Sequence, residues 1–133
     1  MSSPRFEVIL DPDALKEYNK LDNSVVEMVD KVIDELEYRA DEVGKTLSNY
    51  NDTKLAGCKE IKLKNIGIRI VFRITNEKVD VLRVAYILTV EKRSDDFVFK
   101  IAHKRYKFLK ALSKPSLVEY LKRQLNWRNR EKK

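Results

Sequence analysis

Two strands joined by a tight turn are encoded in the stretch Lys62-Leu-Lys-Asn-Ile-Gly-Ile-Arg-Ile-Val-Phe-Arg73. Apolar residues in and around it recur with a period of two, at Ile61, Leu63, Ile68, Ile70, Phe72 and Ile74. Successive side chains of a strand point to opposite faces, so each strand has one buried face. The other face carries the cations Lys62, Lys64, Arg69 and Arg73. A cationic sheet face suits a polyphosphate partner.

The residues before this stretch predict a strand, two helices and a loop. A short strand is expected from Arg5 to Leu10. Asp11-Pro12 then provides a cap and a first-turn proline for a helix over about residues 12–21. Apolar residues at three- and four-residue spacings predict a second helix from Asn23 or Ser24 to about residue 39. The polar segment 44–57 reads as a loop.

The rest of the chain predicts a meander followed by helices. Strands are expected near residues 58–64, 67–75 and 78–90, with tight connections at 65–67 and 76–78. Ser94 and Asp95 cap a helix that Pro115 ends, and Ser116 with Glu119 has capping-box spacing for a final helix. The apolar stripe of the first of these helices comprises Val98, Ile101, Ala102, Phe108, Leu109 and Leu112.

Together these elements predict an α+β fold. An N-terminal strand and a two-helix hairpin pack on an antiparallel sheet of about four strands, and C-terminal helices follow. The length and the 43% hydrophobic content fit a single domain over residues 1–133. A basic helical extension occupies about residues 113–133.

The net charge of +7 is unevenly distributed along the chain. Residues 1–53 hold six Lys and Arg against thirteen Asp and Glu, whereas residues 54–133 hold twenty-two against eight. The basic part is expected to meet nucleic acid or an acidic protein, although a merely solvated charged surface is the alternative. The single cysteine, Cys58, fits a reducing compartment, and no apolar run is long enough for a signal peptide or membrane span. We therefore expect a cytoplasmic protein without a membrane partner.

The order of elements and two motifs resemble the RelE/ParE superfamily of toxins from toxin–antitoxin systems, over about residues 5–110. Lys62-Leu-x4-Arg69-x2-Phe72 is similar to the KLx4GYRLVY-type strands of RelE toxins, and Glu77-Lys-Val79 fits their next turn. The strand-to-helix motif of these toxins, usually KRx4VYx2AxKR, is matched in spacing by Lys92-Arg93-x4-Val98-Phe99-x2-Ala102-x-Lys104-Arg105.

The resemblance implies a ribosome-dependent endoribonuclease that cleaves mRNA in the decoding site and so inhibits translation. It implies a cognate antitoxin, the ribosome and mRNA as partners, and a metal-independent reaction without a cofactor. Arg69 and Arg93 would stabilise the charge that develops on the phosphate, because guanidinium groups stay ionised and fit phosphate oxygens. Lys62 would transfer a proton or contact phosphate. Further RNA contacts are expected from Lys64, Arg73, Lys92, Lys104 and Arg105.

Two positions depart from the RelE pattern. Phe99 stands where these toxins carry a tyrosine, and a phenyl ring stacks on a base but transfers no proton. Glu60 replaces a strand lysine. It is either a general base or, as the simpler interpretation, an ion-pair partner of Lys62 or Lys64. Tyr86 and Tyr106 supply a phenol only if the fold brings them to the site.

These departures keep other functions open. A ParE-like inhibitor of DNA gyrase, or a weakened toxin that blocks without cutting, is the second hypothesis, and a general nucleic-acid-binding module is the third. The sole histidine, His103, shares a helix face with Phe99 by spacing and is either catalytic or an exposed helix residue. Cys58 reads as a buried strand thiol, and Trp127 as an anchor of the last helix or a base-stacking ring.

Overall fold

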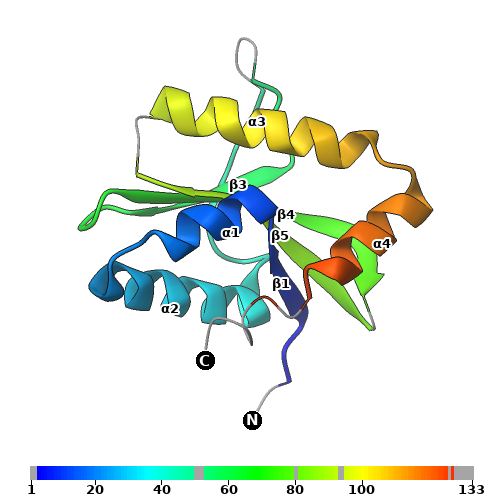
Figure 1. The fold of residues 1–133 in the computed structure, drawn as a ribbon, viewed down its shortest axis with the longest axis horizontal. Coiled ribbons are helices and arrows are strands. Elements are labelled where there is room, and N and C mark those ends of the chain that lie inside the picture. The colour runs from blue at the N-terminus through cyan, green and yellow to red at the C-terminus, as the bar shows by residue number, and fades with distance from the viewer. Residues whose placement is uncertain (1–2, 50–52, 80, 93–94, 126, 128–133) are drawn as a thin grey trace.

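A mixed five-stranded sheet forms the centre of the protein in a computed structural model that describes residues 3–49, 53–79, 81–92, 95–125 and 127 (Figure 1). The strand order is β1-β5-β4-β3-β2. β1 (Phe6–Leu10) runs parallel to β5 (Leu82–Glu91), and the other neighbours, β4 (Ile68–Val79), β3 (Cys58–Leu63) and β2 (Lys45–Thr46), pair antiparallel. The predicted α+β class is confirmed. The sheet has one more strand than expected because β2 lies inside the predicted loop, and the prediction of an antiparallel sheet is wrong for β1, which pairs parallel to β5.

The two-helix hairpin covers one face of the sheet. Helix α1 (Pro12–Asn19) begins where predicted, because the Asp11 carboxylate accepts a hydrogen bond from the Asp13 amide at 2.9 Å. Helix α2 (Asn23–Arg39) buries one stripe of its side chains against the sheet, namely Val29, Ile33 and Leu36. These residues form one core with β1, β4 and β5. Both helix predictions are confirmed.

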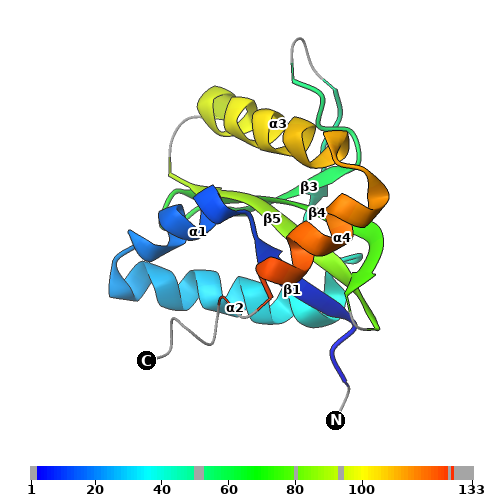
Figure 2. The ribbon, with the colours of Figure 1, turned by 45° about the vertical axis from the view of Figure 1, so that its right-hand side comes forward.

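The C-terminal helices cover the opposite face (Figures 1 and 2). Helix α3 (Asp95–Ala111) and helix α4 (Lys114–Arg123) form a second core with inward residues of β3, β4 and β5. The buried residues of α3 are Val98, Ala102, Tyr106 and Leu109. Phe108, which the predicted stripe included, is 53% exposed instead. The predicted apolar stripe of α3 therefore differs from the buried face of the helix, because it included the exposed Phe108 and left out the buried Tyr106.

Three predicted boundaries are wrong. The expected turn at residues 76–78 lies within β4, because Lys78 and Val79 pair with β5. Ser116 does not cap the last helix. Instead Ser113 is the N-cap, and its Oγ accepts a hydrogen bond from the Ser116 amide at 3.3 Å. Pro115 consequently lies in the first turn of α4, where a missing N–H costs nothing.

Trp127 ties the end of the described chain to the N-terminal half. Its side chain is 2% exposed, and its indole Nε1 donates a hydrogen bond to the Val8 carbonyl oxygen at 3.0 Å. The ring meets Tyr18 edge to face, with 5.3 Å between centroids. This contact bears out the interpretation of Trp127 as an anchor. Within the described residues, no helix combines the length and apolar character needed to cross a membrane.

Candidate functional site

A row of charged side chains crosses three strands on the face that α3 and α4 cover. Lys62 on β3 is in register with Arg69 on β4, and Arg69 is in register with Glu91 on β5. Directly opposed residues of antiparallel strands point to the same side, with Cβ atoms about 5 Å apart. We call Lys62, Arg69 and Glu91 the polar row. The predicted common face of Lys62 and Arg69 is confirmed.

Glu60 lies beside the polar row and binds Arg69. Arg69 Nη1 donates to Glu60 Oε2 at 2.7 Å, and the two side chains are 15% and 6% exposed. The sequence predicted that Glu60 forms an ion pair with Lys62 or Lys64. The ion pair exists, but its partner is Arg69. Lys62 itself is exposed, and Lys64 lies in the turn that follows β3 rather than on the strand.

Arg73 shares this face but is held beneath α3. It pairs in register with Cys58, and its guanidinium stacks on the Tyr106 ring at 5.0 Å from the centroid. Gly57 has a φ of +92° and leaves room for Arg73, whose Nη1 occupies the place of a side chain there. Burial raises the pKa of the Cys58 thiol to about 11, against the opposing effect of Arg73. Cys58 is thus the buried strand thiol that the sequence predicted.

Arg105 binds within the protein, in conflict with its predicted RNA contact. Its Nη2 and Nη1 donate to the two carboxylate oxygens of Glu17 at 2.8 and 3.1 Å, and Nη1 also donates to the Leu88 carbonyl at 2.9 Å. Glu17 Oε1 accepts from the Thr89 hydroxyl and the Val90 amide as well. The guanidinium is therefore engaged in joining α3 to α1 and β5, and we withdraw Arg105 from the RNA-binding set.

The other predicted site residues are distributed along the end of β5 and along α3. Phe99 is half-buried against the core beneath α3 and α4. Lys92 and Lys104 are exposed, whereas Arg93 lies outside the described residues. His103 Nδ1 accepts a hydrogen bond from the Lys54 amide at 2.9 Å, so its ring holds a loop against α3.

Both candidate phenols are buried and contact residues outside the polar row. Tyr86 is fully buried, and its hydroxyl donates to Asp11 Oδ1 at 2.9 Å. Tyr106 is 5% exposed and lies against Arg73. Asp11 is 5% exposed, and burial raises its pKa. From the sequence, Asp11 was interpreted only as a helix cap. Its buried contacts with Tyr86 and Arg105 were not predicted, because these residues come from distant segments.

The chain has relatives among characterised toxins, although no protein-family model matches it. The mRNA interferase toxin RelE of Escherichia coli K12 is 33% identical to it over 96 residues, which cover 71% of this chain and 90% of that protein. The chain belongs to the RelE toxin family. The mRNA interferase RelE of Shigella flexneri matches with the same identity and coverage.

Solved RelE structures share the fold. A doubly substituted E. coli RelE in the free state superposes with a TM-score of 0.59 at 30% identity, covering 77% of this chain and 98% of that one. RelE from the intact E. coli RelBE toxin–antitoxin complex gives a TM-score of 0.51 at 27% identity, covering 67% and 98%. The protein is accordingly a RelE-like toxin of the RelE/ParE superfamily.

Proposed function

We propose that this RelE-like toxin is a ribosome-dependent endoribonuclease that cleaves mRNA and so inhibits translation. The observation that carries the proposal is the register of Lys62 with Arg69 on one sheet face, in a family whose E. coli member is named an mRNA interferase. Two cations side by side provide the positive site that a cleaved phosphodiester needs. The same surface provides the contacts for a strand of RNA.

Cleavage of RNA by its own 2′-hydroxyl requires three tasks. A base removes the hydroxyl proton, donors stabilise the phosphorane, and an acid protonates the leaving oxygen. Arg69, together with Arg93, takes the stabilising role. Lys62 is the exposed cation nearest to Arg69 by register, and it either transfers a proton or binds phosphate. Phe99 stacks on a base.

The ion pair between Glu60 and Arg69 favours a second candidate function. A phosphate must compete with the Glu60 carboxylate for Arg69, and Phe99 supplies no proton. Both features fit a weakened toxin that occupies its target without cutting, or a ParE-like inhibitor of DNA gyrase. Alternatively, Glu60 is the base itself, with Arg69 holding it ionised.

The partners follow from the proposal. The E. coli relative forms a complex with an antitoxin, RelB. We propose a cognate antitoxin for this chain, an acidic or amphipathic segment that folds on the basic surface and blocks it. Because the proposed targets, ribosomes and mRNA, are cytoplasmic, we propose that the protein acts in the cytoplasm. The residues involved require neither a metal nor a cofactor in this mechanism.

Primer extension on a reporter mRNA in a reconstituted translation system tests the proposal, with and without ribosomes. The variants are Arg93→Ala, Phe99→Tyr, and the double variant Glu60→Gln with Arg69→Gln. The double variant avoids leaving a buried carboxylate unpaired, which would destabilise the fold. Lys78→Gln is the matched control, because Lys78 is an exposed cation on β4 outside the polar row.

Cuts that require ribosomes, persist in Lys78→Gln and disappear in the double variant support the proposal. The single variant Glu60→Gln, with its folding checked by circular dichroism, then separates the roles of Glu60: activity that persists shows that the carboxylate only pairs with Arg69, and loss of activity in a folded variant supports Glu60 as the base. Intact mRNA with the natural protein but cutting by Phe99→Tyr supports the weakened toxin. Intact mRNA throughout rejects the endoribonuclease.

A further inference from the structure

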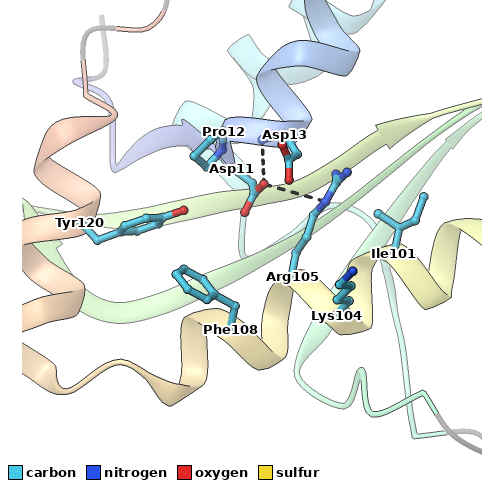
Figure 3. A pocket seen from close by; sticks show the side chains of 8 residues that line it. All are labelled: Asp11, Pro12, Asp13, Ile101, Lys104, Arg105, Phe108 and Tyr120. Atoms are coloured by element: carbon cyan, nitrogen blue, oxygen red, sulfur yellow. Dashed lines mark hydrogen bonds and ion pairs between the residues drawn. The ribbon is translucent and has the colours of Figure 1, made fainter.

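A concave site, separate from the polar row, lies between the start of α1, the middle of α3 and α4 (Figure 3). Its volume is about 470 Å³, within the range typical of ligand sites. Asp11, Lys104, Arg105, Phe108 and Tyr120 are among its lining residues, and none of the polar row belongs to them. Helix α4 contributes a wall, so this site depends on the C-terminal part of the chain.

The floor of the cavity is a buried carboxylate. The Asp11 side chain points into the space between Tyr120, Phe108 and Arg105 (Figure 3). Oδ1 accepts from the Tyr86 hydroxyl and Oδ2 from the Asp13 amide, both at 2.9 Å. Each carboxylate oxygen has two lone pairs, so both keep an acceptor position for a ligand. Arg105 is directed mainly to Glu17, and its Nε lies 3.9 Å from Asp11. The floor therefore favours a ligand with two adjacent N–H donors.

One wall of the cavity is aromatic. The rings of Phe108 and Tyr120 meet at 5.7 Å between centroids with an interplanar angle of 62°. Phe108 remains 53% exposed despite this contact. An exposed phenyl ring beside a cavity offers a flat apolar surface on which a planar group can stack.

The rim of the cavity carries charges of both signs. Lys104 and Asp13 both line it and are exposed. Both helices that form it carry further exposed cations, namely Lys100, Lys107 and Lys110 on α3, and Lys114, Lys122 and Arg123 on α4. A phosphate is thus favoured near Lys104 and disfavoured at the carboxylates of Asp11 and Asp13. With Asp11 at the floor, Phe108 in the wall and Lys104 at the rim, the cavity suits a nucleotide whose base enters first and whose phosphate stays at the rim.

We propose that this cavity binds an unpaired guanosine of an RNA strand. Guanine presents N1–H and N2–H side by side, so its edge can donate two hydrogen bonds to one carboxylate, and Asp11 is placed to receive them. Uracil has one such donor, and adenine and cytosine have only their amino group. Phe108 stacks on the base, and Lys104 contacts its phosphate.

The choice of RNA rests on the proposed function, whereas binding itself does not require cleavage. Phe99, which the proposed function assigns to the RNA-cleaving site, and Phe108 are nine residues apart on α3, about 14 Å along the helix axis and about half a turn around it. The two rings therefore lie on opposite sides of α3, and an RNA strand that contacts both must cross the helix. The guanosine site would give the toxin a sequence preference at a nucleotide away from the cut.

NMR titration of the full chain with the trinucleotides UGU, UAU and UUU tests the proposal. Free guanosine 5′-monophosphate and N-acetyl-argininamide are run alongside. The expected result is that UGU binds about tenfold more tightly than UAU or UUU and shifts the amide signals of Asp11 and Tyr120. Phe108→Ala should weaken UGU binding about tenfold, in line with the usual effect of removing a stacking ring. Lys104→Gln should weaken all three trinucleotides.

Matched controls are Phe97→Ala, which alters an aromatic side chain of α3 that does not line the cavity, and Lys78→Gln, which alters an exposed cation on β4. Asp11→Asn preserves a helix-capping side chain while replacing one acceptor by a donor, so it should abolish the preference for UGU but keep the fold. Equal binding of the three trinucleotides, or UGU binding unchanged by Phe108→Ala, overturns the proposal. Tighter binding of the free nucleotide than of UGU overturns RNA as the source. Binding of argininamide alone shows a protein-docking site instead.

Discussion

Arg105 on α3 and Glu17 on α1, 88 positions apart in the chain, form a two-pronged ion pair in the folded protein. Each side chain is 16% exposed, and the same carboxylate accepts from the Val90 amide at 3.1 Å on β5. One acidic side chain therefore joins two helices and the end of the strand that carries Glu91. Because Glu91 faces Arg69, this pair stabilises the region in which the polar row lies.

Breaking this ion pair should destabilise the protein strongly. Glu17→Gln leaves a mostly buried guanidinium without its carboxylate, which typically costs about 3–5 kcal/mol of unfolding free energy. Urea denaturation followed by circular dichroism measures the loss. The control is Glu35→Gln, which breaks the pair with Arg39 at 3.0 Å, where the side chains are 47% and 51% exposed. That variant should lose less than about 1 kcal/mol. Equal losses in the two variants would show that Glu17 is not a central tie.

Replacing Trp127 with phenylalanine should also lower stability. The variant keeps an aromatic ring near Tyr18 but removes the donor to the buried Val8 carbonyl oxygen. An unsatisfied buried acceptor costs about 1–3 kcal/mol. The midpoint of urea denaturation should fall, and hydrogen exchange at the β1 amides should speed up. Unchanged exchange in β1 would contradict the assignment of Trp127 as the anchor of the chain end.

Gly57→Ala should be more harmful than Gly67→Ala. Both glycines have positive φ, +92° and +67°, so both substitutions strain the backbone by about 1 kcal/mol. A methyl group at residue 57 also collides with the Arg73 guanidinium, whereas at residue 67 it meets open space. Thermal melts of the two variants measure the difference. Matching melting temperatures would mean that Arg73 moves aside without cost.

The Cys58 thiol should make stability fall at high pH. Its folded pKa of about 11 lies above the ordinary value of 9.0, so the folded state retains the proton longer than the unfolded state does. Unfolding then releases a proton between pH 9 and pH 11, and the free energy of unfolding falls by about 2–3 kcal/mol over that range. Below pH 9 the thiol has no effect on the slope. The Cys58→Ala variant should lack this contribution, and an identical pH slope in both proteins would refute it.

The sequence predicted the sheet better than the surroundings of its charged residues. Alternation around Lys62 and Arg69 is a local property of a strand, so the shared face was readable. The partner of Arg69 was not, because Glu60 lies equally close to Lys62 by spacing. Arg105 was misassigned for a related reason. A cation on a helix looks the same in sequence whether it meets solvent or a carboxylate 88 positions away.

The start of α4 was mispredicted because two nearby serines both fit the sequence pattern of a helix N-cap. Ser113 and Ser116 are both suited to capping a helix. Only the fold shows that Ser113 is the N-cap. The cavity lined by Asp11, Phe108 and Tyr120 could not be predicted from the sequence, since these residues come from three distant segments. Its aromatic wall was hidden further by the placement of Phe108 in the predicted core stripe.

The most direct test of the central claim is the rate at which this protein cleaves mRNA on programmed ribosomes, compared with Lys62→Gln and Lys78→Gln. Both lysines are exposed, so neither substitution should alter folding. Removing one donor from a charge-stabilising site typically lowers the rate by about 10²–10³. We predict a loss of about this size in Lys62→Gln and an unchanged rate in Lys78→Gln. Equal rates in the natural protein and Lys62→Gln, or no cleavage by the natural protein, would contradict the polar row as a catalytic site.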